Sequence, residues 1–530
     1  MKFKLTTILI FVLGLALFIR LVGITKVPIS INWDEAGFGY SAYSLLITGK
    51  DEYGVVMPLQ FKSVGDYKNP LYVYLLVLPI KIWKLNEFTV RLPPAILGSL
   101  AVMAATGIAY EILRNKKWTL IYGVMMAFSP WQIQFSRAGA DVGVSTFFVV
   151  MGIWLFLRRR QTLSAIMLAG SAYAYFSDKL FSPLIAFGLA KLKNWKFLFV
   201  FSLVFVGALI SGVTKGHQGK VWMTTLLSYQ QPIEDVQKLQ RADSEWEYKM
   251  FHNQVWLYGK MFLDRYFNHF SPKFLFTQGP EDNRQRIWGM GMMLWPEFFL
   301  GLVAVFFGDK FKLKHKYFLI FWTLLAPLPS AITKDAVHAR RALDLVYPLM
   351  IWYVGSAQFL WLRIKSKWKI ILAGLFGLAW CLALLRYLVS YYVWTPIRTA
   401  QGSGGWQYGY KQLVSTVSPR AKYFDKVIID TTYQGPYIFF LFYLNYPPDK
   451  YQKQANLIIE NPLALGEGSG FDNYVFREVY WPRDRGLTKI LIAAPPEKIP
   501  EKDIDNIHFK LVDKIYFPDG TPAWFIVESI

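Results

Sequence analysis

The feature that most constrains this chain is a series of long apolar runs joined by short basic links. The first run extends from Leu5 to Ile24 and is long enough to cross a bilayer. At about 20 residues per crossing, the pattern predicts a polytopic α-helical membrane protein with about 11 transmembrane helices. We expect these helices near residues 5–24, 88–112, 118–135, 142–157, 161–177, 180–190, 196–213, 290–308, 317–333, 342–361 and 369–392.

The distribution of positive charge predicts the orientation of these helices. Lys and Arg gather in the links on the cytoplasmic side of membrane proteins. Lys2 and Lys4 place the N-terminus inside, every basic link then falls inside, and an odd number of crossings places the C-terminus outside. The basic links are 114–117, 158–160, 191–196, 310–316 and 363–369.

Composition excludes several other classes. The chain has 530 residues, 54% of them hydrophobic, which is too apolar for an ordinary soluble protein. Its net charge of +22 lies in the links, which favours membrane topology over a nucleic-acid-binding surface. Cys381 is the single cysteine, so neither an internal disulfide nor a cysteine-rich metal site can form. The first run lacks a small-residue cleavage site and is interpreted as an anchor, not a signal peptide.

We expect a transmembrane region over 1–392 and a small α/β domain outside the membrane over 393–530. Residues 40–46 are predicted to form an amphipathic stretch in the membrane interface. The tail carries short runs typical of strands, separated by loops and a helix near 411–417. The large outer loops are expected at 25–87 and 214–289, and the strands at 426–430, 489–492, 509–512 and 523–527.

An adjacent acid pair, Asp34-Glu35, follows the first run and lies after Trp33. Carboxylates near a membrane are costly unless they are solvated, paired or used. One carboxylate can act as a general base on an acceptor hydroxyl, and its neighbour can orient the acceptor or help to hold a cation. A solvated pair or a helix N-cap is the structural alternative.

Lys68 lies in the same loop, within Tyr67-Lys68-Asn69-Pro70. A lysine before a proline turn can present its ammonium group to a phosphate, or it can extend toward the membrane interface as an anchor. Arg91 opens the second span in Arg91-Leu92-Pro93-Pro94 and either orients the first loop or anchors the helix at the interface.

Further cations lie at the outer ends of later spans, where the topology does not require them. Arg137 follows Ser129-Pro130-Trp131 and precedes Asp141, so it binds either a phosphate or that acid. Lys179 has the same two alternatives, with Asp178 as its partner. His338, Arg340 and Arg341 open the tenth span, and this grouping favours an anion site for phosphate or pyrophosphate.

Taken together, these motifs resemble the C-fold (GT-C) membrane glycosyltransferases. The similarity covers residues 1–390 and is greatest to the protein O-mannosyltransferase-like branch, glycosyltransferase family 39, and to the related lipid A aminoarabinose transferases. It rests on the Asp-Glu pair, the lysine before proline, Arg-Leu-Pro, and Ser-Pro-Trp followed by Ser-Arg. Two departures are Lys68-Asn69-Pro70, where the family often has Lys-Pro-Pro, and Asp178-Lys179, where relatives often have an arginine.

The resemblance implies an enzyme of the prokaryotic plasma membrane that transfers a hexose or pentose from a polyprenyl-phosphate donor. The acceptor would be a hydroxyl of a glycan, lipid or protein on the outer side. Asp34 would be the base and Glu35 its partner. Donor-phosphate contacts would come from Lys68, Arg137, Lys179, His338, Arg340 and Arg341, with support from Trp33, Tyr67, Asn69, Arg91 and Asp141.

Two matters stay open from the residues alone. A transporter or flippase for lipid-linked glycans is the alternative function, although internal repeats and charged or broken midplane helices are not evident. The sequence carries no evident cofactor motif, and a divalent cation near the acid pair is possible in principle. Membrane lipids are expected partners, and nucleic acid is not.

Overall fold

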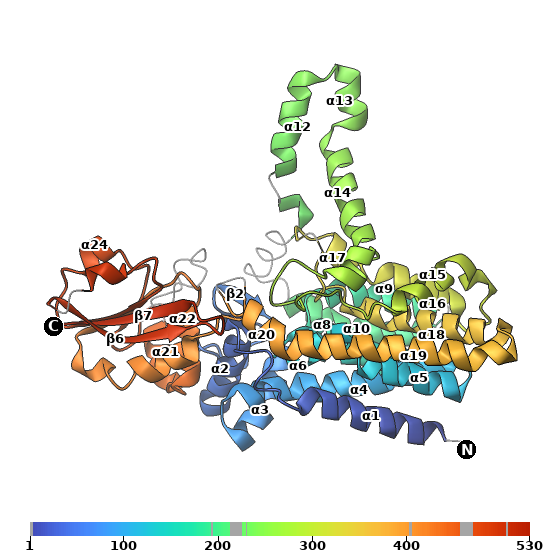
Figure 1. Cartoon of the computed structure of the whole chain (residues 1–530), viewed down its shortest axis with the longest axis horizontal. Coiled ribbons are helices and arrows are strands. Elements are labelled where there is room, and N and C mark those ends of the chain that lie inside the picture. Colours follow the sequence, from blue (N-terminus) through green and yellow to red (C-terminus); the bar gives the residue numbers. More distant parts are fainter. Residues whose placement is uncertain are drawn as a thin grey trace.

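The computed structural model describes residues 4–191, 194–211, 225–228, 231–335, 337–401, 405–455, 470–504 and 507–530. Most of the long helices run along the longest axis of the molecule, and a small sheet packs beyond one end of them (Figure 1). We call this the sheet end. The opposite, basic end carries the links between α4 and α5, α7 and α8, α15 and α16, and α18 and α19.

The bundle contains two sets of helices. The first set is α1 (Leu5–Leu21), α4 (Glu87–Leu113), α5 (Lys116–Ala127), α6 (Pro130–Arg137), α7 (Asp141–Leu157), α8 (Gln161–Ala174), α9 (Asp178–Ala190) and α10 (Trp195–Ser211). The second set is α15 (Glu297–Phe307), α16 (Lys316–Leu325), α17 (Leu328–Ala331), α18 (Val346–Arg363), α19 (Ser366–Val389) and α20 (Thr395–Arg398).

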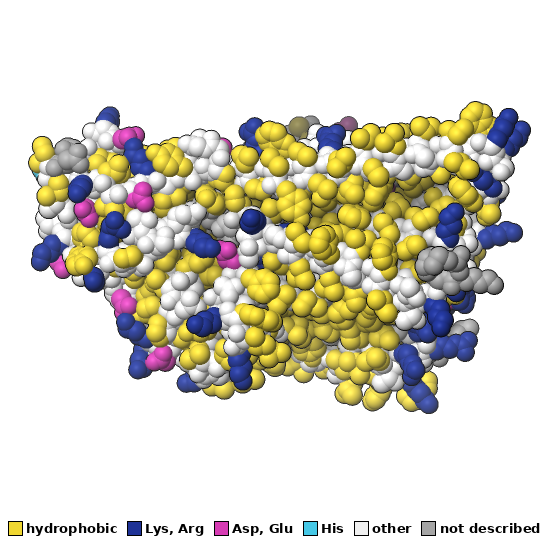
Figure 2. Space-filling view, turned by 60° about the horizontal axis from the view of Figure 1, so that its bottom comes forward, with side chains coloured by type: hydrophobic (Ala, Val, Ile, Leu, Met, Phe, Trp, Pro, Cys, Tyr) yellow, Lys and Arg dark blue, Asp and Glu magenta, His cyan; other side chains and the backbone are white. Residues whose placement is uncertain are grey.

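The surface of the bundle is that of an integral membrane protein. Among the described residues, three helical stretches are long and apolar enough to cross a membrane, at Glu87–Leu113, Leu343–Arg363 and Ser366–Arg398. On the face that Figure 2 shows, a broad apolar surface covers the helices, with basic side chains gathered at one end and mixed charges over the sheet end. The predicted number of about 11 crossings stays a prediction, because several bundle helices are shorter than the roughly 20 residues that a crossing takes.

Prolines divide two of the expected spans. The run at 118–135 is interrupted at Phe128 and Ser129, between α5 and α6, because Pro130 has no N–H with which to continue the helix. The run at 317–333 is interrupted in the same way before α17, where Pro327 is the N-cap. Each break turns the chain near the sheet end.

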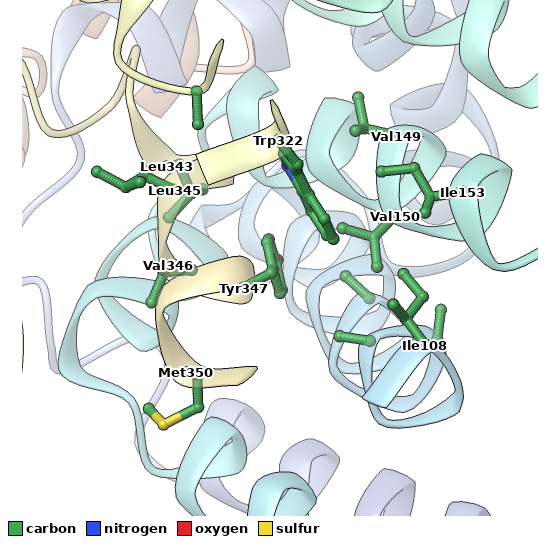
Figure 3. Close-up of a cluster of buried hydrophobic side chains, with 14 of the residues drawn as sticks. Ile108, Val149, Val150, Ile153, Trp322, Leu343, Leu345, Val346, Tyr347 and Met350 are labelled. Carbon is green, nitrogen blue, oxygen red and sulfur yellow. The ribbon is translucent and has the colours of Figure 1, made fainter. Parts of the chain in front are cut away.

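Aromatic and branched side chains fill the centre of the bundle (Figure 3). Trp322 of α16 stacks on Tyr347 of α18, with ring centroids 6.4 Å apart. Ile108 of α4 and Val150 of α7 face the same space. These contacts join the two sets of helices into one core.

The first loop forms α2 (Trp33–Thr48), a hairpin of β1 (Phe61–Ser63) and β2 (Asp66–Lys68), and α3 (Pro70–Trp83). The prediction that 40–46 lies in the membrane interface is wrong. Tyr40 is fully buried, and its hydroxyl donates to the Tyr446 carbonyl of the tail at 3.1 Å. Helices α2 and α3 share one apolar core with the tail, so the amphipathic face of α2 is covered by protein.

The tail forms a five-stranded sheet in the order β4-β3-β5-β7-β6, parallel across β4-β3-β5 and antiparallel beyond. All four predicted strands are confirmed, whereas the three-residue β4 was not predicted because its run is so short. The strands are β3 (Lys426–Ile429), β4 (Tyr474–Phe476), β5 (Ile490–Ala494), β6 (Phe509–Tyr516) and β7 (Pro522–Ser529), and the helices are α21 (Tyr410–Val417), α22 (Pro436–Tyr443), α23 (Pro448–Ala455) and α24 (Trp481–Asp484).

The second large loop forms a helical arm that projects sideways from the bundle, at right angles to its long helices in Figure 1. The arm consists of α12 (Gln231–Ala242), α13 (Glu245–Phe251) and α14 (Gln254–Asn268). Residues 212–224 and 229–230 of this loop lie outside the described residues.

Candidate active site

The acid pair lies in the first turn of α2. Asn32 is the N-cap: its side-chain oxygen accepts from the Glu35 N–H at 3.1 Å, and the Glu35 carboxylate accepts from the Asn32 N–H at 3.0 Å. This reciprocal capping box fixes the start of the helix. Because consecutive helix residues project about 100° apart, Asp34 and Glu35 face different surroundings.

Glu35 is buried and fully occupied by protein contacts. Its Oε1 atom accepts from Arg91 Nε at 2.8 Å and from the Gly139 N–H at 2.7 Å. A Cβ atom at Gly139 would lie 2.8 Å from the Glu35 side chain, so only glycine fits there. Glu35 therefore connects α2 to α4 and to the turn before α7.

Arg91 and Arg137 hold the segment that runs from the end of α1 to the start of α2. Arg91 donates to the carbonyls of Ile24, Pro28 and Ser30 at 2.5–3.0 Å, in addition to Glu35. This geometry supports its orientation of the first loop and not an exposed interfacial anchor. Arg137 donates to five carbonyls at the end of α1 and just beyond it, those of Ile19, Arg20, Val22, Gly23 and Val27.

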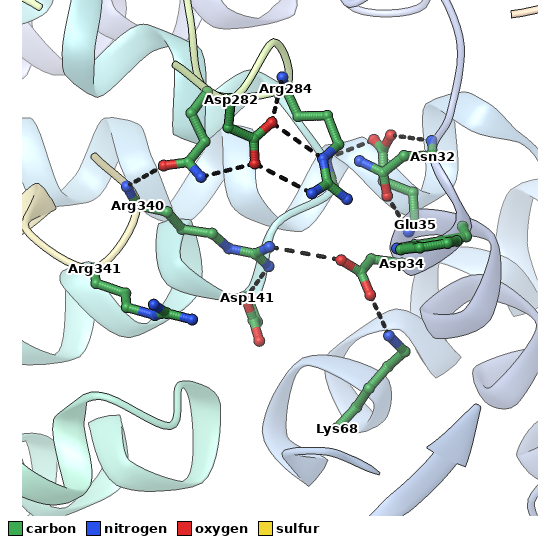
Figure 4. Close-up of polar contacts among 12 residues, drawn as sticks. Asn32, Asp34, Glu35, Lys68, Asp141, Asp282, Arg284, Arg340 and Arg341 are labelled. Atoms are coloured by element: carbon green, nitrogen blue, oxygen red, sulfur yellow. Dashed lines mark hydrogen bonds and ion pairs between the residues drawn. The ribbon is translucent and has the colours of Figure 1, made fainter. Parts of the chain in front are cut away.

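Asp34, by contrast, is half-buried, with 23% of its side chain exposed, and it lies among cations (Figure 4). It forms an ion pair with Lys68, and its Oδ2 atom lies 3.6 Å from Arg340 Nη1. Burial raises the pKa of Asp34, but the charges of Lys68 and Arg340 outweigh burial and hold this pKa well below its usual range. The carboxylate is therefore ionised at neutral pH.

Lys68 ends β2 and is buried directly before α3. Asn69 is the N-cap of α3 and Pro70 its first residue, which fixes the direction in which the chain leaves the lysine. The ammonium group lies 4.9 Å from the centre of the Phe38 ring. Burial lowers the pKa of Lys68, but Asp34 and then Asp66 raise it above its usual value, so the side chain stays charged.

Arg340 bridges two acids. Its Nη2 atom lies 2.5 Å from Oδ1 of Asp141, the first residue of α7, while Nη1 faces Asp34. Asp141 therefore pairs with Arg340 and not with Arg137. Tyr175 lies beneath the guanidinium group, 5.7 Å from ring centre to Cζ. Within the described residues the buried Nε–H of Arg340 has no hydrogen-bond acceptor.

His338 and Arg341 lie beside Arg340. Arg341 donates to Thr333 at 2.7 Å and pairs with Asp335 at 2.6 Å. Burial, together with Arg341 and Arg340, lowers the pKa of His338 well below its usual value. The imidazole is therefore neutral at pH 7 and contributes hydrogen bonding, not positive charge.

The second large loop supplies residues that were not predicted. Asp282 pairs with Arg284 at 3.1 Å, and Gln285 accepts from the Arg340 N–H at 3.1 Å (Figure 4). These residues line a cavity of about 500 Å³. Its basic and imidazole side chains are Lys273, Arg284, Arg286, His338 and Arg341. The only sequence signal was a polar run, 281–286, just before an expected span.

The remaining predicted residues lie around this centre. The Trp33 N–H donates to Gln407 of the tail at 2.9 Å, and Arg284 lies over the Trp33 ring. Tyr67 lies in β2, and Lys179 lies half-buried in the first turn of α9. The structure thus brings Asp34, Lys68, Arg340 and Asp141 together, whereas Glu35, Arg91 and Arg137 lie in the protein core behind them.

The donor set for a metal is limited in this region. Nowhere in the described ranges do three His, Cys, Asp or Glu side chains lie close enough together to hold a metal ion. Asp34 and Asp141, the two acids of this centre, both form ion pairs with Arg340. A divalent cation near the acid pair stays a prediction.

Comparison with known proteins supports the resemblance predicted from the sequence. A family model described as dolichyl-phosphate-mannose-protein mannosyltransferase matches residues 10–230. ArnT from Cupriavidus metallidurans in the apo state is similar in structure, with a TM-score of 0.55 and 9% identity over 98% of both chains. The fold is that of the C-fold membrane glycosyltransferases.

Two further structures are similar. ArnT from the same organism bound to undecaprenyl phosphate gives a TM-score of 0.51 and 9% identity, over 98% of this chain and 97% of that one. The archaeal oligosaccharyltransferase AglB from Archaeoglobus fulgidus, in complex with an inhibitory peptide and a dolichol-phosphate, gives 0.47 and 13% identity over 83% and 64%. No curated protein sequence matches the chain.

Proposed function

We propose that this protein is an integral-membrane glycosyltransferase that moves a hexose or pentose from a polyprenyl-phosphate donor to a hydroxyl acceptor. One observation carries the proposal: the ionised carboxylate of Asp34 is partly exposed between two cations, Lys68 and Arg340. The similarity to ArnT, solved with undecaprenyl phosphate, supports a lipid-phosphate donor.

In this mechanism the cations receive the donor phosphate. Lys68 offers a compact charge, and the Nε–H of Arg340 is a buried donor with no acceptor among the described residues. Both would stabilise the negative charge that develops on the phosphate as its bond to the sugar breaks. Arg284 and Arg341, on the wall of the neighbouring cavity, would add to this positive field.

Asp34 acts as the general base. The acceptor oxygen attacks the anomeric carbon, the bond from that carbon to the phosphate oxygen breaks, and the acceptor proton passes to Asp34. A bound phosphate would compete for Lys68 and Arg340, which now lower the pKa of Asp34. Donor binding would therefore raise the basicity of Asp34 just when the acceptor proton must be removed.

Glu35 and Arg91 are positioning residues in this proposal. Their ion pair is buried and reaches neither the cavity nor the exposed edge of Asp34. It fixes the first turn of α2, and thereby the direction of the Asp34 side chain. Arg137 binds the carbonyls at the end of α1 and just beyond it, and so holds the segment that leads into α2.

We further propose that the basic end faces the cytoplasm and that transfer occurs on the outer face, following the positive-inside rule. The tail would then be extracytoplasmic and would complete the site from outside, as its Gln407 does at Trp33. The acceptor is a glycan, lipid or protein hydroxyl. The prokaryotic plasma membrane is the expected location.

Two measurements on the purified protein in nanodiscs test the proposal. The first is binding of undecaprenyl phosphate, which Arg340→Met should weaken and Asp34→Asn should leave unchanged or strengthen. The second is release of polyprenyl phosphate from a panel of polyprenyl-phosphate hexoses and pentoses, which Asp34→Asn should abolish. Undiminished release by Asp34→Asn would overturn the assignment of the base. Unchanged binding by a Lys68→Met/Arg340→Met double variant would overturn the phosphate site.

A further inference from the structure

The helical arm formed by α12, α13 and α14 carries large apolar side chains on its outside. On α14, Val255 is 83% exposed and Phe267 62%, and Trp256 and Leu263 are about half exposed. At about 100° per residue, these four side chains share one side of the helix, whereas the half-buried Leu257 lies on the opposite side. Trp246, Met250 and Phe251 of α13 are also exposed.

The base of the arm is fixed to the bundle, so its direction is defined. Tyr266 donates to the carbonyl of Leu324 at 2.6 Å, and Arg265 to that of Lys334 at 2.9 Å. Thr225, before α12, pairs with Thr333. From this base the arm projects perpendicular to the long helices, which is the direction of the membrane plane (Figure 1).

The arm also leaves the bundle at the depth of a membrane boundary. Helix α10, which precedes the arm, begins at the basic end and has 17 residues. Its length is about 25 Å at 1.5 Å per residue, close to the roughly 30 Å of a hydrocarbon core. Helix α10 therefore ends near the far boundary of the core, where Trp and Tyr are enriched in membrane proteins.

We propose that this arm lies in the lipid headgroup region of the leaflet at the sheet end, with the exposed side of α14 inserted toward the acyl chains. Exposed apolar side chains on one side of a helix that runs in the plane of the membrane are the pattern of an interfacial helix, which is held by burial of apolar area. The inference depends on the membrane embedding of the bundle and not on sugar transfer.

This position has a consequence for the site. Asn268, the last residue of α14, lines the basic cavity together with Ser271 and Lys273, which follow the helix. An arm held among the headgroups keeps the mouth of that cavity at the level of lipid phosphates.

Spin labels in nanodiscs test the position without any turnover assay. In a Cys381→Ala background, one label is placed at Leu263→Cys on the apolar side and one at Asp264→Cys, its neighbour on the polar side. Oxygen concentrates in lipid, whereas the nickel chelate stays in water. The ratio of oxygen collisions to nickel-chelate collisions should be several-fold higher for the label at 263 than for the label at 264. Val255→Cys and Gln254→Cys repeat the comparison should the first pair express poorly.

Other results would overturn the proposal. Equal access of the nickel chelate to both labels would mean that the arm stands in water. Protection of the 263 label from both reagents would mean that protein covers it, and spin–spin broadening would identify that protein as a second copy. Because no sugar is used, this outcome is separate from failure of the proposed transferase.

Discussion

Asp34 and Glu35 are adjacent in sequence and lie in two different regions of the molecule. Glu35 is 1% exposed and bonded to Arg91, whereas 23% of the Asp34 side chain is exposed beside Lys68 and Arg340. In the first region the Nε, Nη1 and Nη2 atoms of Arg91 each donate to an acceptor. In the second, Arg340 keeps a buried N–H without one among the described residues. The completed Glu35–Arg91 pair fixes the start of α2, whereas the open donor of Arg340, next to the partly exposed Asp34, leaves capacity for a ligand.

The largest expected effect is on catalysis, in Asp34→Asn. Loss of the base should reduce turnover about 10²- to 10⁴-fold, while the unfolding temperature falls only modestly, because Lys68 and Arg340 lose a paired carboxylate that is itself partly exposed. Single-turnover release of polyprenyl phosphate and thermal unfolding in detergent check this. Glu35→Gln should lower the unfolding temperature more than Asp34→Asn does, because Glu35 is fully buried, and should largely keep the activity per folded molecule. Equal loss of activity in both variants would erase the distinction between the two regions.

The next effect is on stability, in Arg91→Ala. This change leaves Glu35 buried and unpaired and frees three carbonyls, which should reduce the free energy of unfolding by about 3–5 kcal/mol. Arg158→Ala is the matched control, because that arginine is 54% exposed in its pair with Glu111. It should cost at most about 1 kcal/mol. Thermal or chemical unfolding of both variants decides the matter, and similar stabilities would contradict a scaffold role for Arg91.

A smaller effect is expected on lipid binding, in Lys68→Met. Loss of one charged hydrogen bond of about 1.5–3 kcal/mol should weaken binding of undecaprenyl phosphate about 10- to 100-fold. Lys62→Met is the control, since Lys62 lies in the same β-hairpin and contacts only the Tyr53 ring in the contacts described. Titration of nanodiscs with the lipid measures both. Equal affinities would place the phosphate away from the open region.

The smallest effect concerns Glu52, which lies between the first loop and the tail. Burial and then Asp51 raise the pKa of Glu52 to about 8. An acid whose pKa is raised in the folded state binds more protons there, so stability falls as pH rises from about 4.5 to about 8. Glu52→Gln should remove this slope and make the variant more stable than the unchanged protein above pH 8. Unfolding measured at pH 5 and pH 8.5 checks it, and an unchanged slope would contradict the raised pKa.

Much of the fold follows from the sequence, because an apolar run bounded by basic links has few stable arrangements other than a helix that crosses the membrane. The runs at 88–112 and 369–392 became α4 and α19 with little error. Pro130 and Pro327 are helix breakers in the sequence, but the prediction followed the length of each apolar run and treated each run as one span. The amphipathic face of α2 was misassigned because protein and lipid cover apolar residues equally well.

The sequence identified many of the charged residues of the site but not which of them pair with each other. Lys68, Arg340 and Asp141 were expected at the same end of the molecule as Asp34, but their pairing depends on packing between helices far apart in sequence. Burial of Arg137 could not be read from its charge. Asp282 and Arg284 were missed because a polar run in a long loop has no periodicity that marks a site.

Helix α19 differs from α4 in a way that bears on biosynthesis. Helix α4 is 72% buried over its most apolar stretch, whereas the continuous helix Ser366–Arg398 is only 6% buried there and is more hydrophobic. A segment this apolar partitions into lipid without help from neighbouring helices, while α4, with Arg91 and Glu111, needs its partners. The helix that directly precedes the tail is thus able to insert by itself, and its insertion determines the side of the membrane on which the sheet folds and closes over α2.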